Sequence, residues 1–183
     1  MAEGFRYAAL RQDFLDGVSR ALGRLKTGGT VYAIAVDPGD LYDRAFLYAN
    51  TMEALPDAAD EMDHLALKWS IADWQHQAFE ADDLKPFNDG LAAMMGDAYA
   101  LDRARLEAHC ADMQAFYVET LSLLSSRFGA ERPLFGLFRT DQSDEDMIAS
   151  VERLNPPDMA ARFAGELRRL RLLQAEELAA LER

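Results

Sequence analysis

The pattern of hydrophobic and polar positions predicts a helix-rich chain with a few short strands. Helical spacing is clearest over residues 102–128, where apolar side chains recur every three or four positions along one stripe. The same spacing predicts a helix over residues 5–26 and a long helix from Asp158 onward. The stripe of the central helix consists of Leu106, Cys110, Met113, Tyr117, Leu121, Leu124 and Phe128.

Short runs of β-branched and apolar residues predict the strands. Thr30 to Val36 is continuously apolar rather than alternating, which is typical of a strand covered on both faces. Arg44 to Ala49 predicts a second strand, and an antiparallel pair with the first is the simplest arrangement. Leu134 to Arg139 predicts another strand, while Leu65 to Trp69 is compatible with a strand or a helix.

Capping and breaking residues predict the remaining helices. Asn50, with Glu53 three places later, predicts a helix that runs toward His64. Residues 70–79 predict a short helix or helical turn, and residues 84–99 predict a helix with Pro86 near its start. Ser143 predicts the cap of a helix that ends at the sequence Asn155-Pro156-Pro157.

Together these elements predict an α+β fold. A small, mostly antiparallel sheet of three to four strands packs against several helices, and the last helix is long. Residues 1–183 are expected to form a single domain, because the sequence contains no repeat, low-complexity tract or linker. Leu172 faces away from the main stripe of the last helix, which predicts that this helix buries more than one side. The leucine-rich segment of residues 157–183 is also a candidate oligomerisation element. The main stripe consists of Phe163, Leu167, Leu170, Gln174, Leu178 and Leu181.

Composition favours a cytoplasmic protein. Half of the 183 residues are hydrophobic, but no apolar run is long enough to span a bilayer. The first residues do not resemble a secretory signal. The only cysteine, Cys110, lies on the stripe of the central helix and is expected to be a small buried hydrophobe rather than a nucleophile.

Negative charge is concentrated in the middle third of the chain. The net charge is −13, and the segment from Asp37 to Asp97 contains fourteen acidic and three basic residues. Such a surface repels phosphate backbones and anionic lipids, which argues against nucleic-acid and membrane binding. It would attract a basic protein partner, although solubility alone also explains an acidic surface.

No catalytic motif is recognisable, and three groups of residues are weak candidate sites. Asp60 and His64 are four positions apart on a predicted helix and could face one metal ion, but a metal site needs at least three ligands. No cofactor is expected. A second candidate, for binding, is the cluster of Trp69, Asp73, Trp74 and His76, which core packing explains more simply. A third is the cluster of Asp141, Ser143, Asp144 and Asp146, which helix capping explains more simply.

Three stretches of the sequence carry a resemblance to a known family through their order and spacing. They are Val31 to Val36 with Tyr48 to Thr51, Lys68 to Ser70 with Asp73-Trp74, and Asp141 to Asp144 with Ser150 to Pro156. Together they resemble an uncharacterised bacterial family, the domain of unknown function numbered 4303. The family has no established activity, so the resemblance implies no catalytic residue. Its members resemble accessory proteins found near toxin systems, which implies an immunity role by analogy.

The sequence therefore favours a non-enzymatic protein-binding domain, with an immunity or regulatory role, that uses its acidic face to engage a basic partner. The alternatives are a small metal-assisted hydrolase built on Asp60, His64 or the Asp141 cluster, and a structural homodimer that pairs through the helix after Pro157.

Overall fold

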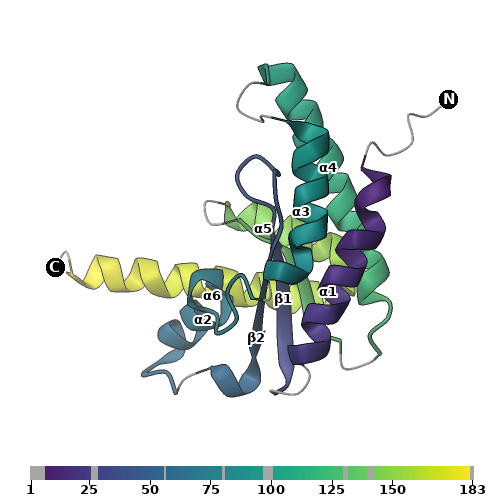
Figure 1. Ribbon diagram of the computed structural model, residues 1–183. Coiled ribbons are helices and arrows are strands. Elements are labelled where there is room, and N and C mark those ends of the chain that lie inside the picture. The colour runs from purple at the N-terminus through teal and green to yellow at the C-terminus, as the bar shows by residue number, and fades with distance from the viewer. Residues whose placement is uncertain are drawn as a thin grey trace.

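A three-stranded sheet lies between two layers of helices in the computed structural model of the chain (Figure 1). The structure describes residues 7–25, 29–55, 57–79, 81–96, 101–129, 132–139 and 142–181. The strands are β1 (Val31–Asp37), β2 (Phe46–Thr51) and β3 (Leu134–Leu137). The helices are α1 (Arg11–Leu25), α2 (Glu61–Trp69), α3 (Ala81–Met95), α4 (Arg103–Ser125), α5 (Asp144–Leu154) and α6 (Pro157–Leu181), with short 3-10 helices at Ala8–Leu10, Met52–Ala54 and Ile71–Asp73.

The sheet has the strand order β2-β1-β3 and is mixed. β1 pairs antiparallel with β2, as predicted, with Ile34 opposite Ala49. β1 pairs parallel with β3, with Ala35 opposite Gly136. A parallel pair needs a long connection, and the helices between β2 and β3 provide one. The predicted α+β class is confirmed, but only one of the two strand pairs is antiparallel.

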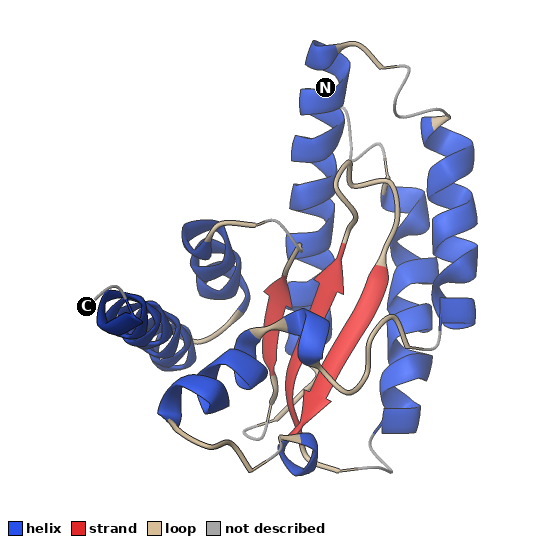
Figure 2. Cartoon of the chain, turned by 90° about the vertical axis from the view of Figure 1, so that its left-hand side faces the viewer, coloured by secondary structure: helices blue, strands red, loops and turns tan. Residues whose placement is uncertain are grey.

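Each face of the central strand is covered by its own layer of helices. Ile34 and Val36 belong to a core formed with α1, α3 and α4, whereas Ala33 and Ala35 belong to a second core formed with α2, α5 and α6. Figure 2 shows the strands between these two sets of helices. The prediction that this strand is covered on both faces is therefore confirmed.

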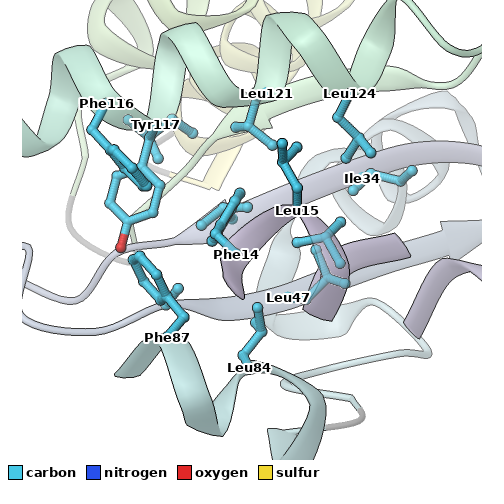
Figure 3. Packing of buried hydrophobic residues seen from close by; sticks show 14 of the residues in the cluster. Phe14, Leu15, Ile34, Leu47, Leu84, Phe87, Phe116, Tyr117, Leu121 and Leu124 are labelled. Atoms are coloured by element: carbon cyan, nitrogen blue, oxygen red, sulfur yellow. The ribbon is translucent and has the colours of Figure 1, made fainter. Parts of the chain in front are cut away.

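The first core is built around Phe14 of α1 (Figure 3). Its ring lies 5.1 Å from Phe87 of α3 and 5.5 Å from Tyr117 of α4, edge to face in both cases. α1 and α3 approach so closely at Gly17 that a Cβ there would lie 2.5 Å from the carbonyl oxygen of Asp83. Glycine is thus required for this helix contact.

The second core anchors only the first half of α6. Phe163, Leu167 and Leu170 are buried against α2 and α5, and Phe163 lies 4.8 Å from the Trp69 ring. The second half of α6 projects away from the sheet (Figure 1), which leaves Leu178 60% and Leu181 78% exposed on the same stripe. Leu172, on the opposite face, is 59% exposed. The prediction that α6 buries a second side at Leu172 is therefore wrong.

The predicted capping box of Asn50 and Glu53, after the second strand, is wrong. Asn50 does not start a helix: it lies in β2, is buried, and donates from Nδ2 to the Tyr32 hydroxyl at 3.0 Å. Glu53 accepts a hydrogen bond from the backbone N–H of Thr30 at 2.8 Å instead of capping a helix. The ambiguous run Leu65 to Trp69 is helical and forms the end of α2, whose N-cap is Asp60.

Helix boundaries elsewhere follow the predictions with small shifts. α3 begins at Ala81 rather than Leu84, so Pro86 lies inside the helix. Ser143 caps α5 by accepting the N–H of Asp146 at 3.2 Å, and α5 ends before Asn155. Cys110 is only partly buried, and burial raises its thiol pKa, which agrees with an unreactive side chain. No helix among the described residues has the length and apolar character needed to cross a membrane.

Candidate functional site

The tryptophan cluster, for which core packing was the simpler explanation and a binding surface the alternative, is mostly part of the core. Trp74 is 1% exposed, and its indole N–H donates to the Lys68 carbonyl at 3.0 Å. The backbone of His76 pairs with Ala49 at the edge of the sheet, and its ring packs against Phe79. Asp73 is exposed in a short 3-10 helix. The structure does not bring these four side chains together around one site.

The two acidic clusters have structural roles. Asp60 Oδ1 accepts the Asp63 N–H at 2.9 Å as the N-cap of α2, and His64 is exposed. Arg171 of α6 holds Asp144 with two bonds of 2.7 Å and lowers the pKa of that carboxyl. Asp141 lies outside the described residues. Among the described residues no three His, Cys, Asp or Glu side chains converge to hold a metal ion, and no observation favours the metal-assisted hydrolase.

One pocket of about 550 Å³ opens beside Trp69, between the start of β1, the end of α2 and the first turns of α6. A volume of this size is typical of sites for small molecules. Its walls combine three basic side chains with aromatic rings and thioethers. The lining residues are Thr30, Val31, Tyr32, Met52, Lys68, Trp69, Arg132, Leu134, Met159, Arg162 and Phe163.

An ion cluster around the buried Lys68 forms one wall of this pocket. Lys68 is 7% exposed, and its ammonium donates to Glu166 Oε2 at 2.6 Å. The same oxygen accepts the Trp69 indole N–H at 2.8 Å, and Oε1 accepts Nε of Arg162 at 3.1 Å. Burial raises the pKa of Glu166, but the bonds and charges of these donors outweigh it and lower the pKa. The cluster therefore keeps Glu166 ionised and has a net positive charge.

Arg132 contributes a further positive charge to the pocket, and no carboxylate of the described residues pairs with it. One of its terminal nitrogens donates to the Leu154 carbonyl at 2.7 Å and lies 3.5 Å from Asn155 Oδ1. Its Nε is buried and has no hydrogen-bond partner within the described ranges. No acidic side chain in the described part of the chain forms an ion pair with Arg132. Because Arg132 lines the pocket, its guanidinium places a positive charge there that could pair with an anion.

Sequence reasoning found only Trp69 among the residues of this pocket. Lys68 and Glu166 are 98 positions apart, so no local spacing reveals their contact. Arg132 lies in a loop before β3, where the sequence carries no motif. The only local signal was that Lys68 is one of three basic residues in a strongly acidic segment.

The acidic residues of the segment from Asp37 to Asp97 do not form one continuous face. α2 lies on one side of the sheet and α3 on the other, so their carboxylates are separated. Several of them are also ion-paired: Asp83 with Arg20 and Arg24, Asp43 with Arg44, Asp89 with Lys85, and Glu61 with Arg169. The predicted continuous acidic face therefore does not form, and the carboxylates lie in separate small groups.

One group of exposed carboxylates lies at the start of α2 and in the loop just before it. Asp57, Asp60 and Asp63 are exposed, and none of them forms an ion pair with a described residue. Only Glu61 in this stretch is neutralised, by Arg169 at 2.9 Å. We call Asp57, Asp60 and Asp63 the α2 carboxylates.

Comparison with known proteins identifies a family but no activity. No curated protein and no solved structure matches the chain. Residues 8–156 match the family described as "Domain of unknown function (DUF4303)", a span that runs from the 3-10 helix before α1 to the residue before α6. The match covers most of the 183 residues, and the chain therefore belongs to the DUF4303 family.

Proposed function

We propose that this protein is a non-enzymatic protein-binding domain, with an immunity or regulatory role, that engages a basic partner through the α2 carboxylates. The observation that carries the proposal is that these three exposed carboxylates form no ion pair with any described residue, in a chain of net charge −13. Helix capping accounts for Asp60, but it does not account for Asp57. Like charges placed together on a surface repel one another, and a basic partner would relieve this repulsion.

Neutralising the α2 carboxylates tests the proposal. The variant Asp57→Asn/Asp60→Asn/Asp63→Asn keeps a capping side chain at position 60. A partner captured on the immobilised chain at low salt is expected to associate with this variant about tenfold more slowly, because electrostatic steering acts mainly on the association rate. Stopped-flow or biosensor kinetics at low and high ionic strength measure the effect.

A matched control removes the same charge elsewhere. Asp13, Asp112 and Glu152 are exposed and without ion pairs in the described structure, and they lie on α1, α4 and α5. The variant Asp13→Asn/Asp112→Asn/Glu152→Gln is expected to slow association much less. A partner whose association rate is indifferent to salt, or equally slowed by both variants, would exclude the α2 carboxylates as the docking surface.

A structural homodimer through α6 is a second candidate, favoured by the exposed stripe on its second half. Leu178 and Leu181 continue the stripe that buries Phe163 and Leu170 near the sheet. Glu176 and Glu177 lie nearer the C-terminal end of α6 than Arg168. If two copies of α6 paired antiparallel, the glutamates of one copy would therefore lie toward Arg168 of the other, and opposite charges would meet.

Sedimentation velocity tests this second candidate. Removing all of α6 would expose the second core, so substitution is the better change. Leu178→Gln/Leu181→Gln is expected to convert a dimer to a monomer, whereas Leu172→Gln, which is similarly exposed on the opposite face, is expected to leave the mass unchanged. A monomeric wild-type chain at micromolar concentration would rule out the homodimer.

A further inference from the structure

The pocket beside Trp69 has the opposite electrostatic character to the rest of the protein. Acidic residues outnumber basic residues by 32 to 19 in the whole chain, yet the described residues of the pocket wall include Lys68, Arg132 and Arg162 and no acidic side chain. Such a local reversal of charge distinguishes the pocket from the acidic surface proposed for partner binding.

Glu166, which contacts Lys68 and Arg162, does not neutralise this positive charge. Glu166 already accepts from Lys68, Trp69 and Arg162, so one negative charge serves two cations. Arg132 also lines the pocket and forms no ion pair with a carboxylate of the described structure. The polar groups of the pocket therefore retain an unsatisfied preference for an anion.

The remaining walls favour an apolar or aromatic body. Tyr32, Trp69 and Phe163 contribute rings, and Met52 and Met159 contribute thioethers, which adapt to irregular ligand shapes. The Tyr32 and Trp69 rings meet edge to face at 5.9 Å, so this wall is held in place by packing. A rigid apolar wall beside a few charged groups is the usual composition of a small-molecule site.

We infer that this pocket binds a small organic anion, in which a carboxylate or phosphate group is attached to an aromatic or apolar body. Arg132 would pair with the anionic group, because a guanidinium matches both carboxylate and phosphate oxygens. The Lys68–Glu166–Arg162 cluster would supply further positive charge, and the rings would contact the body of the ligand. This inference does not depend on the α2 carboxylates or on a protein partner.

Paired anionic and neutral compounds test the inference directly. The first pair is indole-3-carboxylate and indole-3-carboxamide, and the second is adenosine 5′-monophosphate and adenosine. Isothermal titration calorimetry is expected to show that at least one anion binds about tenfold or more tightly than its neutral counterpart. Which pair shows the difference distinguishes a carboxylate ligand from a phosphate ligand.

Substitutions then locate the site. Arg132→Met is expected to weaken anion binding about tenfold or more, whereas Arg168→Met removes the same charge from an exposed, unpaired arginine of α6 and is expected to have no effect. Met159→Trp narrows the pocket without changing its charge and is expected to block binding. This second variant keeps the test decisive if Arg132→Met loses its contact with Leu154 and unfolds.

The inference is overturned if neither anion binds at about 1 mM, the weak end of ligand affinities, or if the neutral compounds bind as tightly. It is also overturned if Met159→Trp binds the anion as the wild type does. The triple asparagine variant of the α2 carboxylates is expected to bind the anion normally, so failure of one proposal is distinguishable from failure of the other.

Discussion

Replacing Phe14 by alanine is expected to lower the free energy of unfolding by about 3–5 kcal/mol, the range for removing a buried phenylalanine ring. Phe14 is fully buried at the centre of the first core. Its ring contacts Phe87, Phe116 and Tyr117 at centroid distances of 5.1 to 6.0 Å. The loss includes the burial of the ring, its edge-to-face contacts and the cavity that remains.

Urea denaturation followed by circular dichroism measures this loss. The control is Leu123→Ala on α4, a large hydrophobic side chain that is 44% exposed and is expected to change stability by less than about 1 kcal/mol. A Phe14→Ala protein as stable as the control would show that the aromatic cluster does not hold α1, α3 and α4 together.

Local periodicity predicted part of the buried face of α4. Met113, Tyr117, Leu121 and Leu124 are buried, as their spacing predicts. The stripe missed Phe116, which lies beside Tyr117 and is fully buried, because α4 contacts both α1 and α5 and therefore buries a wider face. The pattern of one helix does not reveal how many neighbours cover it.

Local signals failed where tertiary contacts decided the structure. Asn50 and Glu53 have the spacing of a capping box, but their side chains bond to Tyr32 of the neighbouring strand and to Thr30 just before it. The pocket could not be predicted for the same reason. Its cations come from α2, from the loop before β3 and from α6, and only the folded sheet brings these segments together.

The helix that completes the pocket lies outside the family match. The match ends at residue 156, whereas Arg162, Phe163 and Glu166 belong to α6, which begins at Pro157. α6 nevertheless buries Phe163 and Leu167 in the second core, so it is an integral part of the structure. The positive charge of the pocket therefore depends partly on a segment that the family description does not cover.

Replacing Glu166 by glutamine is expected to destabilise the protein by about 2–3 kcal/mol at neutral pH. Glutamine has the shape of glutamate and can still accept the Trp69 N–H, but it leaves the buried ammonium of Lys68 without a counter-charge. Breaking a buried ion pair costs more than the pair contributes, because the remaining charge stays desolvated. The effect is smaller than for a fully buried pair, since the Glu166 side chain is 22% exposed.

The dependence on pH and a second substitution identify the cause. The pKa of Glu166 is lowered from its ordinary value of 4.5, so the ion pair contributes fully above that pH and its contribution is lost as the pH falls through the lowered value. The deficit of Glu166→Gln should therefore shrink in acid, where the wild type also loses the carboxylate. Lys68→Met combined with Glu166→Gln should recover much of the stability, because no buried charge remains. Urea denaturation across this pH range measures both effects, and a deficit that is constant with pH and unchanged by Lys68→Met would show that Glu166 acts through packing rather than charge.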